Sequence, residues 1–257
     1  MNAVLEVRSA TVRYGGVAAI SDLTLRHDAG GVVGLIGPNG AGKTTLLNAL
    51  SGAVRLAEGE LRFDGTELTR LPADRIARLG VTRTFQNLEV FGSLSVLDNV
   101  VLPTVAARGW RTALADMLRL PRARRQIAAA YDRAWELLAA TGVAEYAHRG
   151  ADSLPYGLQR RVEIARALAG DPGLLLLDEP LAGLSRSEST DLIELITSVA
   201  ADGVTVLLVE HDVAGVMTAS DRVVVLDHGR LLADGTPDEV TADPAVRAAY
   251  LGQEQPS

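Results

Sequence analysis

A nearly unbroken apolar run that leads into a glycine-rich loop constrains the fold of this chain most strongly. The run is VVGLI at Val32–Ile36, the loop is GPNGAGKTT at residues 37–45, and LLNAL follows at residues 46–50. Such a run predicts a strand buried on both faces, and the leucines after the loop predict a helix. Glycines allow the loop to curl so that its N–H groups face a phosphate, and the helix N-terminus adds positive charge. We therefore predict a phosphate-binding loop between a buried strand and a helix.

Lys43 in this loop is the single lysine of a chain that has 25 lysine and arginine residues in total. Gly37, Gly42, Lys43 and Thr44 satisfy the pattern G-x-x-x-x-G-K-[ST]. A compact ammonium on a flexible stem can reach between the β- and γ-phosphate oxygens of a nucleotide, whereas a guanidinium is broader and requires a fork of acceptors. The alternative, a glycine-rich turn with a solvated lysine, leaves the solitary lysine unexplained. We expect Lys43 to contact phosphate.

Further aliphatic runs extend the pattern along the chain. They lie at Leu174–Leu177, Val204–Val209 and Arg222–Leu226, with helical patterns between them. Buried strands that alternate with helices predict an α/β fold with a mainly parallel sheet. The first ~25 residues alternate apolar and polar positions instead, which predicts an antiparallel sheet.

The stretch from about 88 to 168 lacks aliphatic strands and is typical of helices. We expect one domain over residues 1–257, with a catalytic core at about 1–87 and 169–257. A helical subdomain at about 88–168 is expected to be inserted into that core.

Composition excludes several classes of protein. A formal net charge of −7 and a pI near 5.2 argue against general nucleic-acid binding, and the lack of cysteine excludes disulfides and thiolate metal sites. The first residues show no signal-peptide pattern, and the apolar runs are far too short to span a bilayer. We expect a cytoplasmic protein whose membrane role, if it has one, comes through a partner.

Two adjacent carboxylates follow a buried strand in the stretch LLLLDEP. Asp178 comes directly after four leucines, so it emerges at the carboxyl end of the strand, where open α/β sheets bind ligands. There it can anchor Mg²⁺, and Glu179 can orient and deprotonate a water for in-line attack on a γ-phosphate. Pro180 ends the strand. The alternative is a turn that caps the next helix.

Two single polar residues lie where a sensor of the γ-phosphate could be. His211 ends the run VTVLLVEHD, and Gln86 in TRTFQNL lies where the core meets the helical block. Taken alone, the histidine would be read as a partly buried strand-end residue and the glutamine would carry no meaning. Their positions after a predicted strand and at the boundary of the helical block favour the functional interpretation.

Together these motifs resemble the nucleotide-binding subunit of an ABC transporter, in the family order and over essentially the whole chain. GPNGAGKTT resembles the Walker A motif, LLLLDEP the Walker B motif and LAGLS the D-loop, while SLPYGLQRRVEIARAL resembles the signature region. Tyr14 stands where the family has an aromatic that stacks on adenine, Gln86 resembles the Q-loop glutamine, and His211 resembles the switch histidine. A small GTPase would need an N-K-x-D motif, which a chain with one lysine cannot contain.

The resemblance implies a P-loop NTPase core with an N-terminal antiparallel β subdomain and an inserted α-helical subdomain, and it implies ATP and Mg²⁺ as ligands. It assigns catalytic roles to Glu179, His211, Gln86 and Lys43. It assigns metal ligation to Thr44, Gln86 and Asp178. The residues that it places against the nucleotide are Tyr14, Gly37, Pro38, Asn39, Gly40, Ala41, Gly42, Lys43, Thr44, Thr45, Gln86, Asp178 and Gly157.

Finer similarity points to one branch of the family. GVTRTFQNLEVFGSLSVLDNVVLP, RRVEIARALA and the ending ADGTPDEVTADPAVRAAYLG are similar to ATP-binding subunits of branched-chain amino acid importers. Subunits for urea or short amides, and for lipopolysaccharide export, share much of this pattern. Two other functions stay open, a nucleotide-gated structural subunit and a non-transport ATPase that acts on DNA or ribosomes. The latter would normally bring a second cassette or a long coiled coil.

The importer interpretation implies a set of partners and a location. The partners are transmembrane permease subunits, a second ATP-binding subunit and, indirectly, a solute-binding protein, with no nucleic acid. The location is the cytoplasmic side of the cell membrane, where the chain would be peripheral.

The signature region departs from the family pattern L-S-G-G-Q. Pro155 replaces the serine, Tyr156 replaces a glycine and Leu158 replaces the glutamine, while Ser185 closes the D-loop where Asp or Asn is usual. Pro155 supplies neither a hydroxyl nor an N–H. We expect this chain to pair with a second cassette of different sequence, whose signature completes the competent site.

An arginine-rich insert at residues 108–125 has six arginines against the single acid Asp116, with apolar side chains between them. One interpretation is a solvated helical face with ordinary core contacts. The other is docking near anionic headgroups or the cytoplasmic loops of a membrane subunit.

Overall fold

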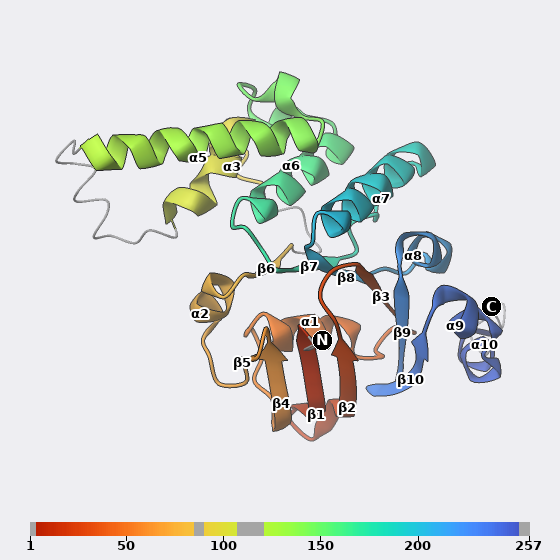
Figure 1. Cartoon of the computed structure of the whole chain (residues 1–257). Coiled ribbons are helices and arrows are strands. Elements are labelled where there is room, and N and C mark those ends of the chain that lie inside the picture. Colours follow the sequence, from red (N-terminus) through yellow and green to blue (C-terminus); the bar gives the residue numbers. More distant parts are fainter. Residues whose placement is uncertain (1–3, 85–89, 107–120, 252–257) are drawn as a thin grey trace. The chain divides into compact units, whose positions relative to one another are not determined.

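The computed structural model describes residues 4–84, 90–106 and 121–251 (Figure 1). Gln86 and most of the arginine-rich insert lie outside these ranges. The chain forms two compact units. Unit 1 comprises Met1–Arg83, Gly173–Ala182 and Ser189–Ser257, and unit 2 comprises Thr84–Pro172 and Gly183–Glu188.

Unit 1 begins with a four-stranded antiparallel sheet in the order β2-β1-β4-β5. Its strands are β1 (Leu5–Tyr14), β2 (Val17–His27), β4 (Glu58–Phe63) and β5 (Thr66–Glu67). Leu5 pairs with His27 on one side and with Phe63 on the other, so β1 is central. The predicted N-terminal antiparallel sheet is confirmed, although β4 and β5 come from residues beyond the first 25.

The second sheet of unit 1 has six strands in the order β10-β9-β3-β8-β7-β6. They are β3 (Val32–Ile36), β6 (Val81–Arg83), β7 (Leu174–Asp178), β8 (Thr205–Val209), β9 (Arg222–Asp227) and β10 (Arg230–Gly235). All neighbours are parallel except β9 and β10, which form an antiparallel pair at one edge. β3, β8 and β7 are therefore adjacent and point the same way, so their carboxyl ends lie at one edge of the sheet.

The helices of this part of the chain are α1 (Lys43–Leu50), α2 (Ala73–Arg78), α7 (Arg186–Ala201), α8 (Val213–Ala219), α9 (Pro237–Ala242) and α10 (Pro244–Leu251). α7 starts in the short part of unit 2 and continues in unit 1. The core lies between the sheets and α1, where Leu35, Leu47, Leu176 and Leu207 are almost fully buried. Burying each such side chain contributes about 1.5–3 kcal/mol, so the apolar runs that predict the strands also hold them in place.

Unit 2 is helical in its described part. It contains α3 (Val96–Ala106), α5 (Pro121–Ala140) and α6 (Tyr156–Leu168), with 3-10 helices at Ala144–Tyr146 and Ala151–Ser153. Ala130, Ala134, Leu137 and Leu138 are buried along α5, at the spacing of one helix face, and α3 and α6 pack against that helix. No helix within the described ranges is both long and apolar enough to cross a membrane.

Gly34 in the middle of β3 provides the space for α8 to pack on the sheet. A Cβ atom at this position would lie 2.2 Å from Val216 Cγ1 and 2.6 Å from Ser220 Oγ. Gly34→Ala is therefore expected to lower the free energy of unfolding by about 1–3 kcal/mol through overpacking, measured by urea denaturation. Gly16→Ala is the matched control, because a Cβ there meets nothing within 4 Å. An equal loss in both variants would contradict the packing explanation.

Candidate functional site

Most of the predicted site residues of unit 1 lie at or just after the carboxyl ends of three adjacent parallel strands. The glycine-rich loop follows β3, Asp178 and Glu179 lie at the end of β7, and His211 follows β8. Because β8 pairs with both β3 and β7, these segments lie next to each other at one edge of the sheet. Ligands of open α/β sheets bind at this edge.

The glycine-rich loop needs glycine where it enters α1. Gly42 is the N-cap of the helix and has a φ of 101°, in the left-handed region that side chains disfavour. A Cβ at Gly42 would also lie 2.6 Å from the backbone oxygen of Ala19 on β2. Within the loop, Ala41 N donates to Pro38 O at 3.1 Å, and Gly229 N donates to Ala41 O at 3.1 Å. The loop is thus held by its own hydrogen bonds and by the β9–β10 turn.

The side chain of Lys43 lies inside the loop. Lys43 is 6% exposed, and its Nζ donates to Gly37 O at 2.6 Å and to Pro38 O at 3.1 Å. Burial lowers the pKa of the ammonium, while the carboxylates of Glu179 and Asp178 act in the opposite direction. Lys43 therefore lies within electrostatic reach of both acids, and its hydrogen bonds hold the ammonium at the loop backbone.

Asp178 is held by Arg83, which is not one of the predicted site residues. Arg83 Nη2 donates to Asp178 Oδ2 at 2.9 Å, and the side chains of the two residues are 9% and 1% exposed. The other oxygen, Asp178 Oδ1, is buried and has no hydrogen-bond partner among the described residues. A buried carboxylate oxygen is costly to leave without a partner, so this atom has the capacity to accept a ligand.

Glu179 and His211 form a direct pair. His211 Nε2 and Glu179 Oε1 are 2.7 Å apart, with side chains 50% and 13% exposed. The backbone of Glu179 has a φ of 52°, which is uncommon for a residue other than glycine. Its N–H donates to Val209 O at 2.8 Å, which ties the end of β7 to β8. The carboxylate is therefore held by the turn after β7 and by the histidine after β8.

Glu210 joins the segment after β7 to the segment after β8. Its Oε1 accepts from Leu181 N at 2.6 Å and its Oε2 accepts from His211 N at 3.3 Å. The pKa of Glu210 is raised from 4.5 to about 7, mainly because the carboxyl group is buried. The two backbone hydrogen bonds act to lower this pKa, and the negative charges of Glu179 and Asp212 act to raise it. This carboxylate was not predicted, because its partner at Leu181 is 29 residues away.

Glu210 is expected to make the stability of the fold depend on pH. Its pKa is higher in the folded chain than in the unfolded one, so the folded state binds an extra proton between about pH 4.5 and 7. The free energy of unfolding should fall as pH rises through this window, by on the order of 3 kcal/mol in total.

Urea denaturation from pH 4.5 to 8 measures this dependence. Glu210→Gln keeps an oxygen that can accept from Leu181 N and removes the titration, so its curve should lose this fall. Parallel pH curves for the parent and the variant would contradict the assignment.

The residues present fit Mg²⁺ and a nucleotide phosphate. Asp178 Oδ1, which has no hydrogen-bond partner among the described residues, is a hard oxygen ligand of the kind that Mg²⁺ prefers, and the exposed residue Thr44 is on the first turn of α1. The loop provides a buried ammonium and the amino end of a helix. The third predicted metal ligand, Gln86, lies outside the described residues.

The signature region lies in unit 2. Pro155 is the N-cap of α6 with no side-chain cap, and Leu158 N and Gln159 N donate to its carbonyl at 3.0 Å each. Further along α6, Arg160 donates to Glu163 Oε2 at 2.6 Å and to the hydroxyl of Tyr156 at 2.9 Å. The Arg160 guanidinium also lies over the Tyr156 ring. Tyr156, which replaces a family glycine, is therefore part of a polar network inside unit 2.

The remaining predicted contacts are distributed over both units. Tyr14 ends β1 and is 48% exposed, and Pro38, Asn39 and Gly40 are in the loop itself. Gly157 is a buried residue of α6 in unit 2, whereas the other described candidates are in unit 1. Among the described residues, Arg83 and Glu210 contact the predicted site residues without having been predicted from the sequence.

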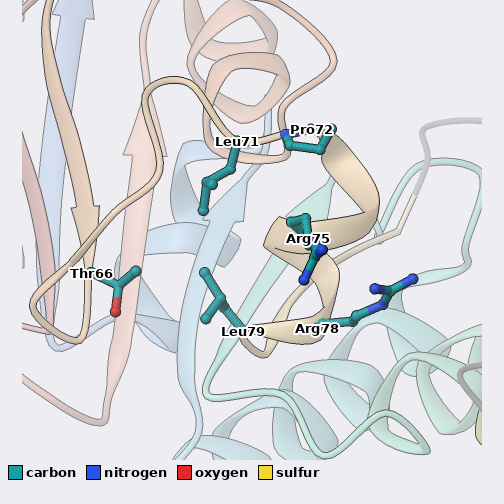
Figure 2. A pocket seen from close by; sticks show the side chains of 6 residues that line it. All are labelled: Thr66, Leu71, Pro72, Arg75, Arg78 and Leu79. Carbon is teal, nitrogen blue, oxygen red and sulfur yellow. The ribbon is translucent and has the colours of Figure 1, made fainter.

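A separate cavity lies at α2 (Figure 2). It has a volume of about 470 Å³ and is lined by Thr66, Leu71, Pro72, Arg75, Arg78 and Leu79. None of these is a predicted site residue, and the cavity has no part in the arrangement described above.

Comparisons with known proteins show the family to which the chain is similar. The profile of the family described as ABC transporter matches residues 20–182, and that of the branched-chain amino acid ATP-binding cassette transporter matches residues 230–255. The chain is 43% identical to the high-affinity branched-chain amino acid transport ATP-binding protein BraF of Pseudomonas aeruginosa, over 97% of this chain and 98% of that protein. It is 40% identical to the corresponding protein LivG of Escherichia coli K12, with the same coverage of both chains.

Among solved structures, the fold is similar to the ADP conformation of MJ1267, an ATP-binding cassette of an ABC transporter. The TM-score is 0.84 at 25% identity, and the match covers 98% of this chain and all of the other. The predicted fold class is thereby confirmed. Because the family profile covers more than half of the chain and the relatives match nearly all of it, the chain belongs to the ATP-binding cassette family of ABC transporters.

Proposed function

We propose that this chain binds and hydrolyses ATP to power an importer of branched-chain amino acids, as a peripheral subunit at the cytoplasmic side of the cell membrane. The observation that carries the proposal is the convergence of the glycine-rich loop, Asp178 and the Glu179–His211 pair at one edge of the parallel sheet. The amino acid branch is supported by the 43% identity to BraF and by the profile match at residues 230–255.

Lys43 and the loop would bind the phosphates. The ammonium donates to Gly37 O and Pro38 O, so it lies against the backbone of the loop. We infer that it exchanges one carbonyl for oxygens of the β- and γ-phosphates, while N–H groups of the loop and of α1 contact the same charge. Tyr14 would stack on the adenine ring with its exposed face.

Glu179 would act as the general base and His211 would orient it. The Glu179 carboxylate, which accepts from His211, would take the proton of a water aimed at the γ-phosphate. His211 is half exposed and can contact the γ-phosphate while it keeps the carboxylate in place. Asp178, Thr44 and Gln86 would hold Mg²⁺, which when bound neutralises phosphate charge that develops during transfer.

The two parts of the chain that the sequence predicts are assigned different roles. We infer that residues of about 1–87 and 169–257 form the catalytic core and that about 88–168 form the signature subdomain. Through that subdomain the chain would contact permease subunits and a second cassette, and the permease would receive the amino acid from a solute-binding protein. The net charge of −7 argues against nucleic acid as a partner.

A reconstituted complex tests the function. The chain, the second cassette and the two permease subunits are reconstituted in proteoliposomes, and the solute-binding protein is added to the transport assay. We expect weak ATPase activity for the chain alone and several-fold stimulation by the binding protein loaded with leucine, isoleucine or valine. Stimulation by urea or a short amide instead would reassign the solute, and nucleotide binding without turnover in the full complex would favour the structural-subunit alternative.

Pro155 leads to a prediction about the pair of cassettes. The first amides of a helix have no partner within the helix, so Tyr156 N and Gly157 N can still face a phosphate, but Pro155 offers no hydroxyl. A donor aimed at transition-state charge is worth about 3 kcal/mol, or roughly a hundredfold in rate. We therefore expect a heterodimer in which the signature of the other cassette completes the site on Lys43 and Glu179, and this signature completes a weaker one.

The asymmetry is measured by base-to-glutamine changes in one subunit at a time. Glu179→Gln in this chain should reduce ATPase activity of the heterodimer far more than the matching change in the partner cassette. Equal losses, or a fully active homodimer of this chain, would show that the two sites are equivalent.

A further inference from the structure

Arg83 connects three elements that meet at the site. It is the last residue of β6, the edge strand next to β7, and its side chain is 9% exposed. Its Nη2 donates to Asp178 Oδ2 at 2.9 Å, while its Nη1 donates to Asn48 Oδ1 at 2.5 Å and reaches Ser51 Oγ at 3.5 Å. Asn48 belongs to α1 and Ser51 is its C-cap, so the guanidinium bridges β7 to the helix that follows the glycine-rich loop.

The backbone alone does not fix the plane of the Asp178 carboxylate. The χ2 angle of an aspartate has a broad distribution, so the carboxylate plane of an isolated side chain is poorly defined. A planar guanidinium held at a second point by Asn48 removes this freedom, because its N–H directions are rigid. One oxygen of Asp178 is thereby engaged, and the other remains buried with no partner among the residues that the structure describes.

We propose that Arg83 is a positioning residue, which fixes the carboxylate of Asp178 so that Oδ1 is the oxygen left for a divalent cation or for its water ligand. This inference rests on the proposed function, in which Asp178 serves Mg²⁺. Partners that orient a metal ligand from behind commonly contribute about 10–100-fold to metal affinity. The arginine also brings a positive charge close to the metal position, which by itself opposes cation binding.

Two substitutions separate orientation from charge. Arg83→Lys retains the charge but replaces the rigid fork by a single ammonium on a flexible stem, so it should lose the fixed bridge to both Asp178 and Asn48. Arg83→Gln removes the charge as well. Arg62→Lys is the matched control, since Arg62 also donates through both Nη atoms, to Glu60 Oε1 and Gly65 O, and touches no candidate site residue in the described contacts.

The measurement is ATP binding by calorimetry with the full chain, in EDTA and over a series of Mg²⁺ concentrations. The Mg²⁺ midpoint is the Mg²⁺ concentration that gives half of the maximal change in ATP affinity. We expect Arg83→Lys to raise this midpoint about tenfold, while ATP affinity in EDTA stays within about twofold of the parent. Arg62→Lys should match the parent in both. A Mg²⁺ midpoint for Arg83→Lys within twofold of the parent overturns the proposal, and if only Arg83→Gln shifts the midpoint, charge and not orientation is the cause.

Two further arms keep the test decisive. If Arg83→Lys does not fold, Asn48→Ala replaces it, because that change removes the second anchor of the guanidinium and should raise the midpoint by a smaller factor. An unchanged midpoint in Asn48→Ala then overturns the proposal. If ATP binding by the parent itself does not respond to Mg²⁺, the assignment of Asp178 to the metal fails, and this inference fails with it.

Discussion

Glu179→Gln is expected to reduce ATP turnover by about 10²–10⁴-fold in the assembled transporter, while ATP binding is retained. The amide keeps an oxygen that can accept from His211, so the 2.7 Å contact and the turn after β7 should survive. What is lost is the ability to take a proton from water. A complex that binds ATP but does not cleave it should then accumulate in an ATP-held dimer.

Glutamate at an exposed position provides the control for this change. Glu194→Gln alters the same functional group at an exposed residue of α7 that is not a predicted site residue, and it should leave turnover within about twofold. Single-turnover assays with the complete complex measure both variants. Near-normal turnover in Glu179→Gln would remove Glu179 from the role of base.

Lys43→Arg is expected to weaken ATP binding by about 10–100-fold, or about 1.4–2.8 kcal/mol, although it retains the charge. Nζ lies 2.6 Å and 3.1 Å from two loop carbonyls in a position that is 6% exposed, and the broader guanidinium cannot occupy that space without moving the loop. Loop N–H groups would then turn away from the phosphates.

Calorimetry with ATP and Mg²⁺ measures this loss, with Lys43→Ala as the reference for complete removal of the cation. Thermal unfolding without nucleotide separates a displaced loop from an unfolded protein. An affinity of Lys43→Arg equal to that of the parent would mean that charge alone matters at this position, and that the single lysine among 25 cations is an accident of composition.

Patterns local in the sequence predict much of this fold. The apolar runs at Val32–Ile36 and Leu174–Leu177 became β3 and β7, because strands covered on both faces must be apolar throughout. The runs near Val209 and Leu226 became β8 and β9 with shifts of one residue at one end. β6 and β10 were not predicted as strands. β6 has three residues, and β10 is a partly exposed edge strand with no apolar run.

The candidate site, like the fold, could be predicted from the sequence only in part. Chain order and strand ends suffice to predict that Asp178 and Glu179 lie next to the glycine-rich loop, since parallel strands share one edge for their carboxyl ends. The pairing of Arg83 with Asp178 spans 95 residues and depends on β6 lying beside β7. No local pattern encodes such a neighbour. The roles of these side chains in catalysis stay predictions.

The left-handed backbone of Glu179 has a consequence for attempts to stabilise this protein. A φ of 52° costs a residue with a side chain roughly 1 kcal/mol that glycine does not incur. Glu179→Gly would relieve this cost, but it would also remove the 2.7 Å contact with His211 and, on the proposed function, the base. Directed evolution of a robust transporter therefore has to measure solute uptake as well as heat resistance, because the backbone of this turn suits glycine while the proposed chemistry requires a carboxylate.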